Sequence, residues 1–150
     1  MSQTERWPEC PQVVDRLFVY GTLRSAGENR FQRQLAAGAE LEGPATLTGQ
    51  LYLIDWYPGV VAAQAREDRV VGESWILREA GREDLLAALD DYEGYDPRDR
   101  AASLFVRESV GVRIRSSGSQ GERCELAWVY WFNRSVDGLE RIASGDFFAP

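Results

Sequence analysis

Residues 82–95 read REDLLAALDDYEGY, and this stretch predicts a helix that ends at a glycine. Glu83 and Asp84 stand in the first turn and Gly94 follows the last one, as is typical of helix ends. On a helical wheel at about 100° per residue, three leucines form one apolar stripe: Leu85, Leu86 and Leu89. We therefore expect this face of the helix to pack on a hydrophobic core.

The acid at the end of this helix has an unusual position. Glu93 lies four residues after Leu89 and seven after Leu86, inside the apolar stripe. Desolvation and the partial negative charge of the helix C-terminus would both raise its pKa, and a carboxyl group with a pKa near neutrality is a competent general base. In the alternative interpretation the helix frays here, and Glu93 caps it or pairs with an arginine at the surface.

A second candidate site follows the first predicted strand, RLFVY at residues 16–20. The segment Tyr20-Gly21-Thr22-Leu23-Arg24 runs from this strand into a glycine turn, a hydroxyl residue and an arginine. Such a turn can expose consecutive backbone N–H groups that hold a carboxylate. The alternative is an ordinary turn with a solvated arginine.

The rest of the chain predicts about six strands and two main helices, hence an α+β domain with a small, strongly curved or closed mixed sheet flanked by helices. Alternation predicts one face for Leu41, Ala45, Leu47, Leu51 and Leu53, and one face for Cys124, Leu126, Trp128, Tyr130 and Phe132. We expect the Arg107 side chain to face either outward or toward the end of the sheet near Glu93. The remaining predicted elements are a helix at 28–39, strands at 40–55 with Gly43 and Gly49 as bends, strands at 60–65 and 70–77 after a turn at 56–59, and a hairpin of 104–115 with 123–132.

Composition excludes several classes of site. The chain has no histidine and no lysine, so no Ser-His-Asp or Cys-His unit, Schiff-base lysine or phosphate-loop lysine is possible. A net charge of −7 disfavours nucleic acid or an anionic membrane as partner. Cys10 and Cys124 are far apart, and we expect neither a disulfide nor a catalytic thiol. With no secretory signal and no apolar membrane segment, we expect a cytoplasmic protein with a tail at 1–15 and one domain at 16–150.

Two motifs together resemble the gamma-glutamylcyclotransferase-like family, in particular its bacterial members. They are VYGTLR at 19–24 and LDDYEGY at 89–95, and weaker similarity extends over about residues 16–147. The resemblance implies a small mixed β-barrel with flanking helices. It also implies that Tyr20, Gly21, Thr22 and Leu23 bind the α-carboxylate of a γ-glutamyl group, and that Glu93 is the general acid/base. We add Arg24, Tyr57 and Pro58 as candidate binding residues.

The implied reaction needs no metal, cofactor or enzyme nucleophile. The α-amine of the substrate attacks its own γ-amide carbonyl and releases 5-oxoproline and an amine or amino acid. One departure from the pattern is Phe105-Val106-Arg107, where many bacterial relatives have Tyr-x-Arg. Two alternatives remain open: a non-catalytic protein that binds a small molecule on the same fold, or an enzyme acting on a γ-glutamyl group of a biosynthetic intermediate. The leaving amine and the oligomeric state are left open.

Overall fold

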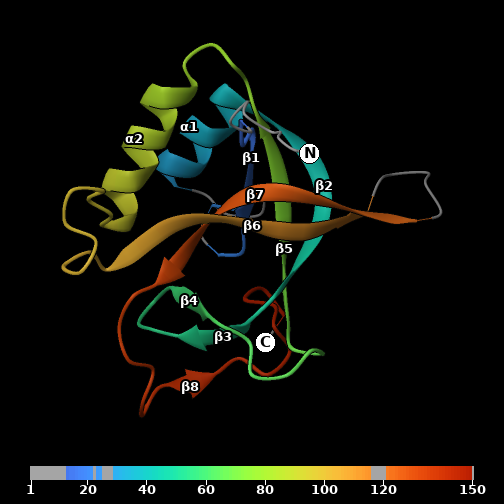
Figure 1. Ribbon diagram of the computed structural model, residues 1–150, viewed down its shortest axis with the longest axis vertical. Coiled ribbons are helices and arrows are strands. Elements are labelled where there is room, and N and C mark those ends of the chain that lie inside the picture. The colour runs from blue at the N-terminus through green and yellow to red at the C-terminus, as the bar shows by residue number, and fades with distance from the viewer. Residues whose placement is uncertain (1–12, 22, 25–28, 116–120, 150) are drawn as a thin grey trace, which may run out of the picture.

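The computed structural model describes residues 13–21, 23–24, 29–115 and 121–149 (Figure 1). Thr22 lies outside these residues. So do most of the predicted tail at 1–15 and most of the turn in the predicted hairpin. The described helices are α1 (Arg30–Gly38) and α2 (Arg82–Glu93), and neither is long and apolar enough to cross a membrane. The described strands are β1 (Arg16–Val19), β2 (Ala39–Thr48), β3 (Gln50–Leu53), β4 (Pro58–Val61), β5 (Arg69–Leu77), β6 (Phe105–Arg115), β7 (Glu122–Phe132) and β8 (Glu140–Arg141).

A closed mixed barrel forms the centre of the fold. Its strands follow the order β1-β5-β2-β6-β7, and a parallel pairing of Leu17 with Trp128 joins β1 to β7 and closes the barrel. From β7 the sheet continues through β4 and β3 to β8. In Figure 1 the two helices lie together on one side, and β3, β4 and β8 lie at the opposite end. The prediction of a small closed mixed barrel flanked by helices is therefore confirmed.

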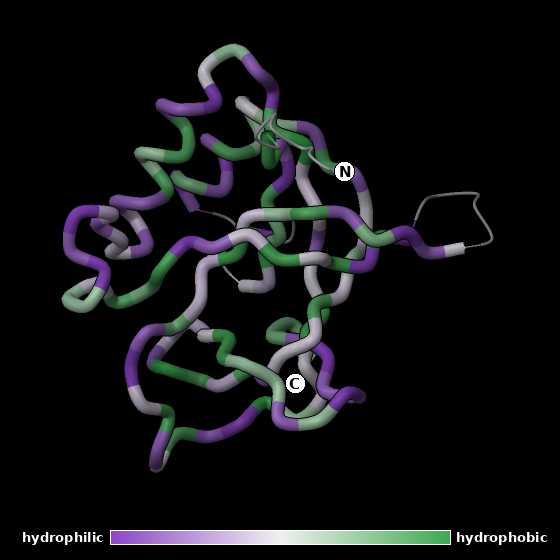
Figure 2. The backbone as a smooth tube through the Cα atoms, in the orientation of Figure 1, coloured by the Kyte–Doolittle hydropathy of each residue, from purple (hydrophilic) through white to green (hydrophobic). Residues whose placement is uncertain are grey.

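Two apolar layers follow from the alternation of side chains along the strands. In β1, Phe18 belongs to the cluster inside the barrel, whereas Leu17 and Val19 belong to the cluster between the barrel and the helices. Figure 2 shows hydrophobic and hydrophilic stretches alternating along both helices. The stripe of α2 packs into the outer cluster, with Leu85, Leu86 and Leu89 at 6%, 8% and 0% exposure.

The single face predicted for Leu41 and Ala45 is wrong, because β2 contains a bulge. The register with β5 shifts between Leu41 and Gly43, so that one extra residue, Glu42, is inserted. Leu41 is consequently 49% exposed, while Ala45 is buried. Gly43 has a positive φ of 152°, and a Cβ there would come within 3.2 Å of the Arg115 carbonyl oxygen. The glycine is what allows the strand to bend at this point.

The face predicted for 124–132 is correct only in its second half. Cys124 and Leu126 are exposed, whereas Tyr130 packs into the outer cluster with Trp128 and Phe132 against it. Ala127, on the other side of the same strand, lies fully buried in the barrel. Both sides of the strand are covered here, because the barrel interior lies on one side and the helices on the other. The strand predicted at 60–65 begins earlier and ends at Val61.

Because Leu89 attaches α2 to the barrel, Leu89→Ala should lower the free energy of unfolding by about 2–5 kcal/mol through lost burial and a residual cavity. Urea denaturation would measure the change. Leu126→Ala, at a position that is 41% exposed, is the control and should change the same quantity by less than about 1 kcal/mol. Equal losses for the two variants would contradict the packing described for α2.

Candidate active site

Glu93 is the last residue of α2. Gly94 caps the helix in the left-handed region at φ 73°, and its N–H donates to the carbonyls of Asp90 and Asp91. The helix therefore continues to Glu93, and the alternative in which it frays does not hold. Burial raises the pKa of the Glu93 carboxyl from 4.5 to about 8, and no arginine of the described residues contributes an opposing effect.

Glu93 lines a pocket with a cavity volume of about 130 Å³. The turn after β1 and the segment leading into β4 form other parts of the wall, so the pocket brings together most of the residues singled out in the sequence. Those present are Tyr20, Gly21, Leu23, Tyr57, Pro58 and Glu93. Thr22 lies outside the described residues. The wall is strongly aromatic and otherwise includes Phe18, Val19, Trp56, Tyr92, Leu104, Phe105 and Tyr130.

The glycine of the turn has a steric role. A Cβ at Gly21 would lie 2.8 Å from Cγ of Pro58, so only glycine lets the turn approach the β4 segment this closely. The Arg24 N–H closes the turn on the Gly21 carbonyl at 3.0 Å. Within the described part of the chain, no carbonyl accepts from the N–H of Gly21 or Leu23. These two N–H groups can therefore serve an anionic ligand.

The structure does not bring Arg24 into the pocket wall. Its Nη1 lies 2.7 Å from Oδ1 of Asp146, and its guanidinium carbon lies 4.9 Å from the centre of the Phe148 ring. Asp146 stands in the C-terminal segment, 122 residues away in sequence. Arg24 thus ties the glycine turn to the C-terminal segment, and its role in substrate binding stays a prediction.

Three tyrosine hydroxyls lie within the electrostatic reach of Glu93. Desolvation is the main cause that raises the pKa of Tyr20, Tyr57 and Tyr130, and the charge of Glu93 adds to it in each case. The Tyr20 hydroxyl donates to the Tyr130 carbonyl at 2.7 Å, so it is already used within the barrel. Tyr20 therefore contributes its ring rather than a free hydroxyl to the pocket.

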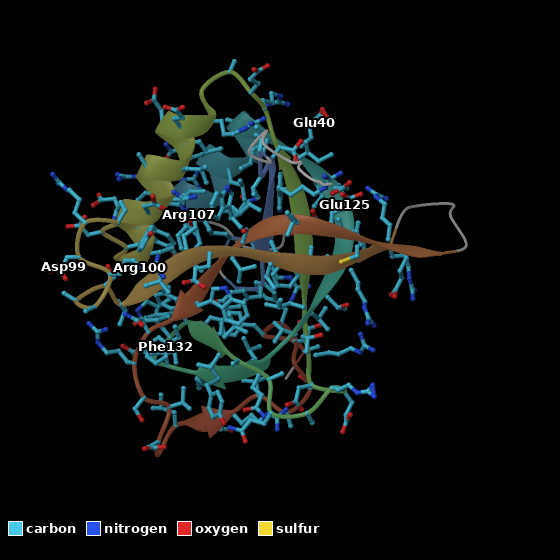
Figure 3. All side chains as sticks on the ribbon, viewed as in Figure 1. Glu40, Asp99, Arg100, Arg107, Glu125 and Phe132 are labelled. Carbon is cyan, nitrogen blue, oxygen red and sulfur yellow. The ribbon has the colours of Figure 1, made fainter. Side chains whose placement is uncertain are left out.

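A buried polar cluster stands behind the pocket and was missed from the sequence. Arg107 donates to both oxygens of Asp90, from Nε at 2.7 Å and from Nη2 at 3.1 Å, and Tyr130 donates to Oδ1 of Asp90 at 2.7 Å. Neither Asp90 nor Tyr130 was among the candidate site residues predicted from the sequence. Of the two directions expected for Arg107, the structure shows the one toward α2 (Figure 3). Among the described residues, no group of three or more acidic or cysteine side chains is arranged to hold a metal ion.

Comparison with known proteins identifies the family. The model of the gamma-glutamyl cyclotransferase, AIG2-like family matches residues 17–149. The chain belongs to this family. The gamma-glutamylcyclotransferase family protein YtfP of Escherichia coli strain K12 is 32% identical over 133 residues, which cover 88% of this chain and 95% of that protein.

Two solved structures share the fold. The solution structure of YtfP from Escherichia coli superposes with a TM-score of 0.58 at 29% identity, covering 89% of this chain and 96% of that one. The crystal structure of an AIG2-like protein from Mus musculus has a TM-score of 0.62 at 20% identity, covering 87% and 86% of the two chains. The second similarity concerns the fold alone.

The raised pKa of Glu93 predicts that the free energy of unfolding depends on pH. Between about pH 4.5 and 8 the folded state keeps a proton on Glu93 that the unfolded chain releases. The free energy of unfolding should therefore fall as pH rises in this window, by at most about 1.4 kcal/mol per pH unit. Glu93→Gln removes this contribution, so its curve should lie increasingly above the wild-type curve toward pH 8. Denaturant unfolding of the wild type and of Glu93→Gln at several pH values in this window would measure the two curves. Parallel curves would contradict the raised pKa of Glu93.

Proposed function

We propose that the protein is a γ-glutamyl cyclotransferase that converts a γ-glutamyl amine or γ-glutamyl amino acid to 5-oxoproline and the free amine or amino acid. The observation that carries the proposal is a desolvated carboxyl group with a pKa of about 8, in one pocket with the glycine turn. Family membership supports the reaction class. Glu93 is the general acid/base, and the turn at Gly21 and Leu23 binds the substrate.

Binding of the α-carboxylate falls to the turn after β1. Its N–H groups at Gly21 and Leu23 have no acceptor among the described residues, and backbone N–H groups in such turns hold anions without a cationic side chain. This suits a pocket whose described wall contains no arginine. The aromatic side chains around it exclude water and strengthen the hydrogen bonds that remain.

The chemistry then requires the movement of protons between Glu93 and two nitrogens. The Glu93 carboxylate takes a proton from the α-ammonium, and the freed amine attacks the γ-amide carbonyl carbon to close a five-membered ring. The protonated Glu93 returns that proton to the leaving nitrogen as the amide C–N bond breaks. The ring nitrogen then loses its second proton to the released amine, which leaves as an ammonium group. Ring closure is intramolecular, so much of the entropic cost is already met. A carboxyl group with a pKa near 8 can act in both directions near neutral pH.

The direct test is to incubate the protein with a panel of γ-glutamyl amines and amino acids and to assay 5-oxoproline. At least one compound should turn over, and Glu93→Gln should lower kcat by about 10²- to 10⁴-fold. Glu83→Gln changes an exposed acid at the start of the same helix and is the matched control. Binding without turnover by the wild type would favour the non-catalytic alternative, and an active Glu93→Gln would refute the role of Glu93.

The pH profile of kcat/KM gives an independent prediction. The free enzyme must carry Glu93 as the carboxylate to accept the first proton, so log kcat/KM should rise with unit slope below about pH 8. Steady-state rates in a series of constant-ionic-strength buffers would measure this. A profile that is already flat at pH 6 would mean that the catalytic base has an ordinary carboxylate pKa.

A further inference from the structure

Tyr130 joins the Asp90–Arg107 ion pair to the pocket. Tyr130 is among the residues that line the pocket, and its hydroxyl donates to Oδ1 of Asp90 at 2.7 Å. Asp90 is itself nearly buried, at 8% exposure, and comes from the same turn of α2 as Glu93. Arg107 reaches Asp90 from β6, and Tyr130 reaches it from β7. The cluster therefore fixes the Tyr130 hydroxyl relative to the helix that carries Glu93.

The ion pair behind Tyr130 is itself held in place. Arg107 donates hydrogen bonds to both carboxylate oxygens of Asp90, at 2.7 and 3.1 Å. Its guanidinium carbon lies 4.4 Å from the centre of the Trp128 ring. A bidentate arginine–carboxylate pair has a defined geometry. Asp90 is consequently held in one orientation, in which its Oδ1 accepts from Tyr130.

This arrangement fixes the hydrogen-bonding role of the hydroxyl. A tyrosine hydroxyl has one proton to donate and lone pairs to accept with. The proton of Tyr130 is directed to Asp90, and desolvation together with the Asp90 charge raises the pKa of Tyr130 well above 10, so it stays protonated. Its oxygen is left as an acceptor, and donation to a carboxylate makes that oxygen a stronger acceptor. The Tyr20 hydroxyl differs, because it donates to a backbone carbonyl and its oxygen already accepts from the Val60 N–H.

We propose that the Tyr130 hydroxyl oxygen accepts a hydrogen bond from the α-amino group of the substrate and orients it for attack, with Asp90 and Arg107 as positioning residues. The inference rests on the proposed function and adds the binding determinant for the amine. The turn at Gly21 offers N–H donors suited to the α-carboxylate, and Tyr130 and Glu93 offer acceptors suited to the α-ammonium. The pocket thereby has complementary groups for both charges of an α-amino acid.

Two ligands that differ only in the amino group test this proposal. The probes are γ-L-glutamyl ethylamide and glutaric acid monoethylamide, which lacks the α-amine. Their affinities are measured by calorimetry in the Glu93→Gln background, which slows turnover of the amino ligand. Adding Tyr130→Phe should reduce the preference for the amino ligand by about 10- to 100-fold, the range for a hydrogen bond to a charged group. Asp90→Asn should reduce the same preference, because the hydroxyl is no longer held as a donor to a carboxylate.

The control is Tyr52→Phe, which removes a hydroxyl that donates to Oε1 of Gln50 and is not part of the pocket wall. It should leave the ratio of the two affinities unchanged, whatever its effect on each. Thermal melts identify variants that do not fold, and Asp90→Asn supplies the comparison if Tyr130→Phe is among them. An unchanged ratio in Tyr130→Phe, or an equal weakening of both ligands, would overturn the role of Tyr130. If the wild type still releases 5-oxoproline, only this inference fails, whereas absence of both binding and turnover overturns the proposed function as well.

Discussion

The packing of the leucine stripe of α2 against the barrel is the interaction on which the site depends. Leu89 is fully buried there, and it sets the rotation of the helix about its axis. With that rotation fixed, Glu93 must point the same way one turn later, into the pocket. Gly94, in the left-handed region, ends the helix immediately afterwards. Glu93 therefore occupies the last position of the helix, at the edge of the apolar layer.

The same helical turn carries two acids with opposite surroundings. Asp90 has a bidentate arginine and a tyrosine hydroxyl as partners, which offset the cost of removing its charge from water. Glu93 has no such partner among the described residues, so its pKa rises to about 8. This contrast separates the two functions that we assign: Asp90 holds a neighbouring group in position, and Glu93 exchanges protons. The chain contains no histidine, and a desolvated glutamate supplies a group that titrates in the same pH range.

The sequence predicted those features that depend on local periodicity. The stripe of α2, the inward direction of Glu93 and the glycine turn at Gly21 all follow from the spacing of neighbouring residues. The structure buries the stripe in the core and places Glu93 and Gly21 in one pocket. Leu41 was assigned to the wrong face, because a one-residue bulge reverses the alternation and leaves no signal in the spacing beyond Gly43.

Contacts between distant segments were the features that the sequence did not predict. The pairing of Asp90 with Arg107 depends on how α2 docks on β6, and the partner of Arg24 lies 122 residues away. Local patterns carry no information on such pairings. For the same reason Tyr130 was not predicted as a site residue, although its hydroxyl takes part in the cluster beside the pocket.

The proposed reaction depends on the raised pKa of Glu93, and the protonation state of this side chain can be observed directly. Carbon-detected NMR of protein labelled with ¹³C at the glutamate side chains, assigned by comparison with Glu93→Gln, would follow its carboxyl chemical shift across a pH titration. The structure predicts a midpoint near pH 8. A midpoint close to 4.5, the ordinary value for a glutamate carboxyl, would contradict the account, because a solvated Glu93 could not be the desolvated base on which the proposed reaction relies.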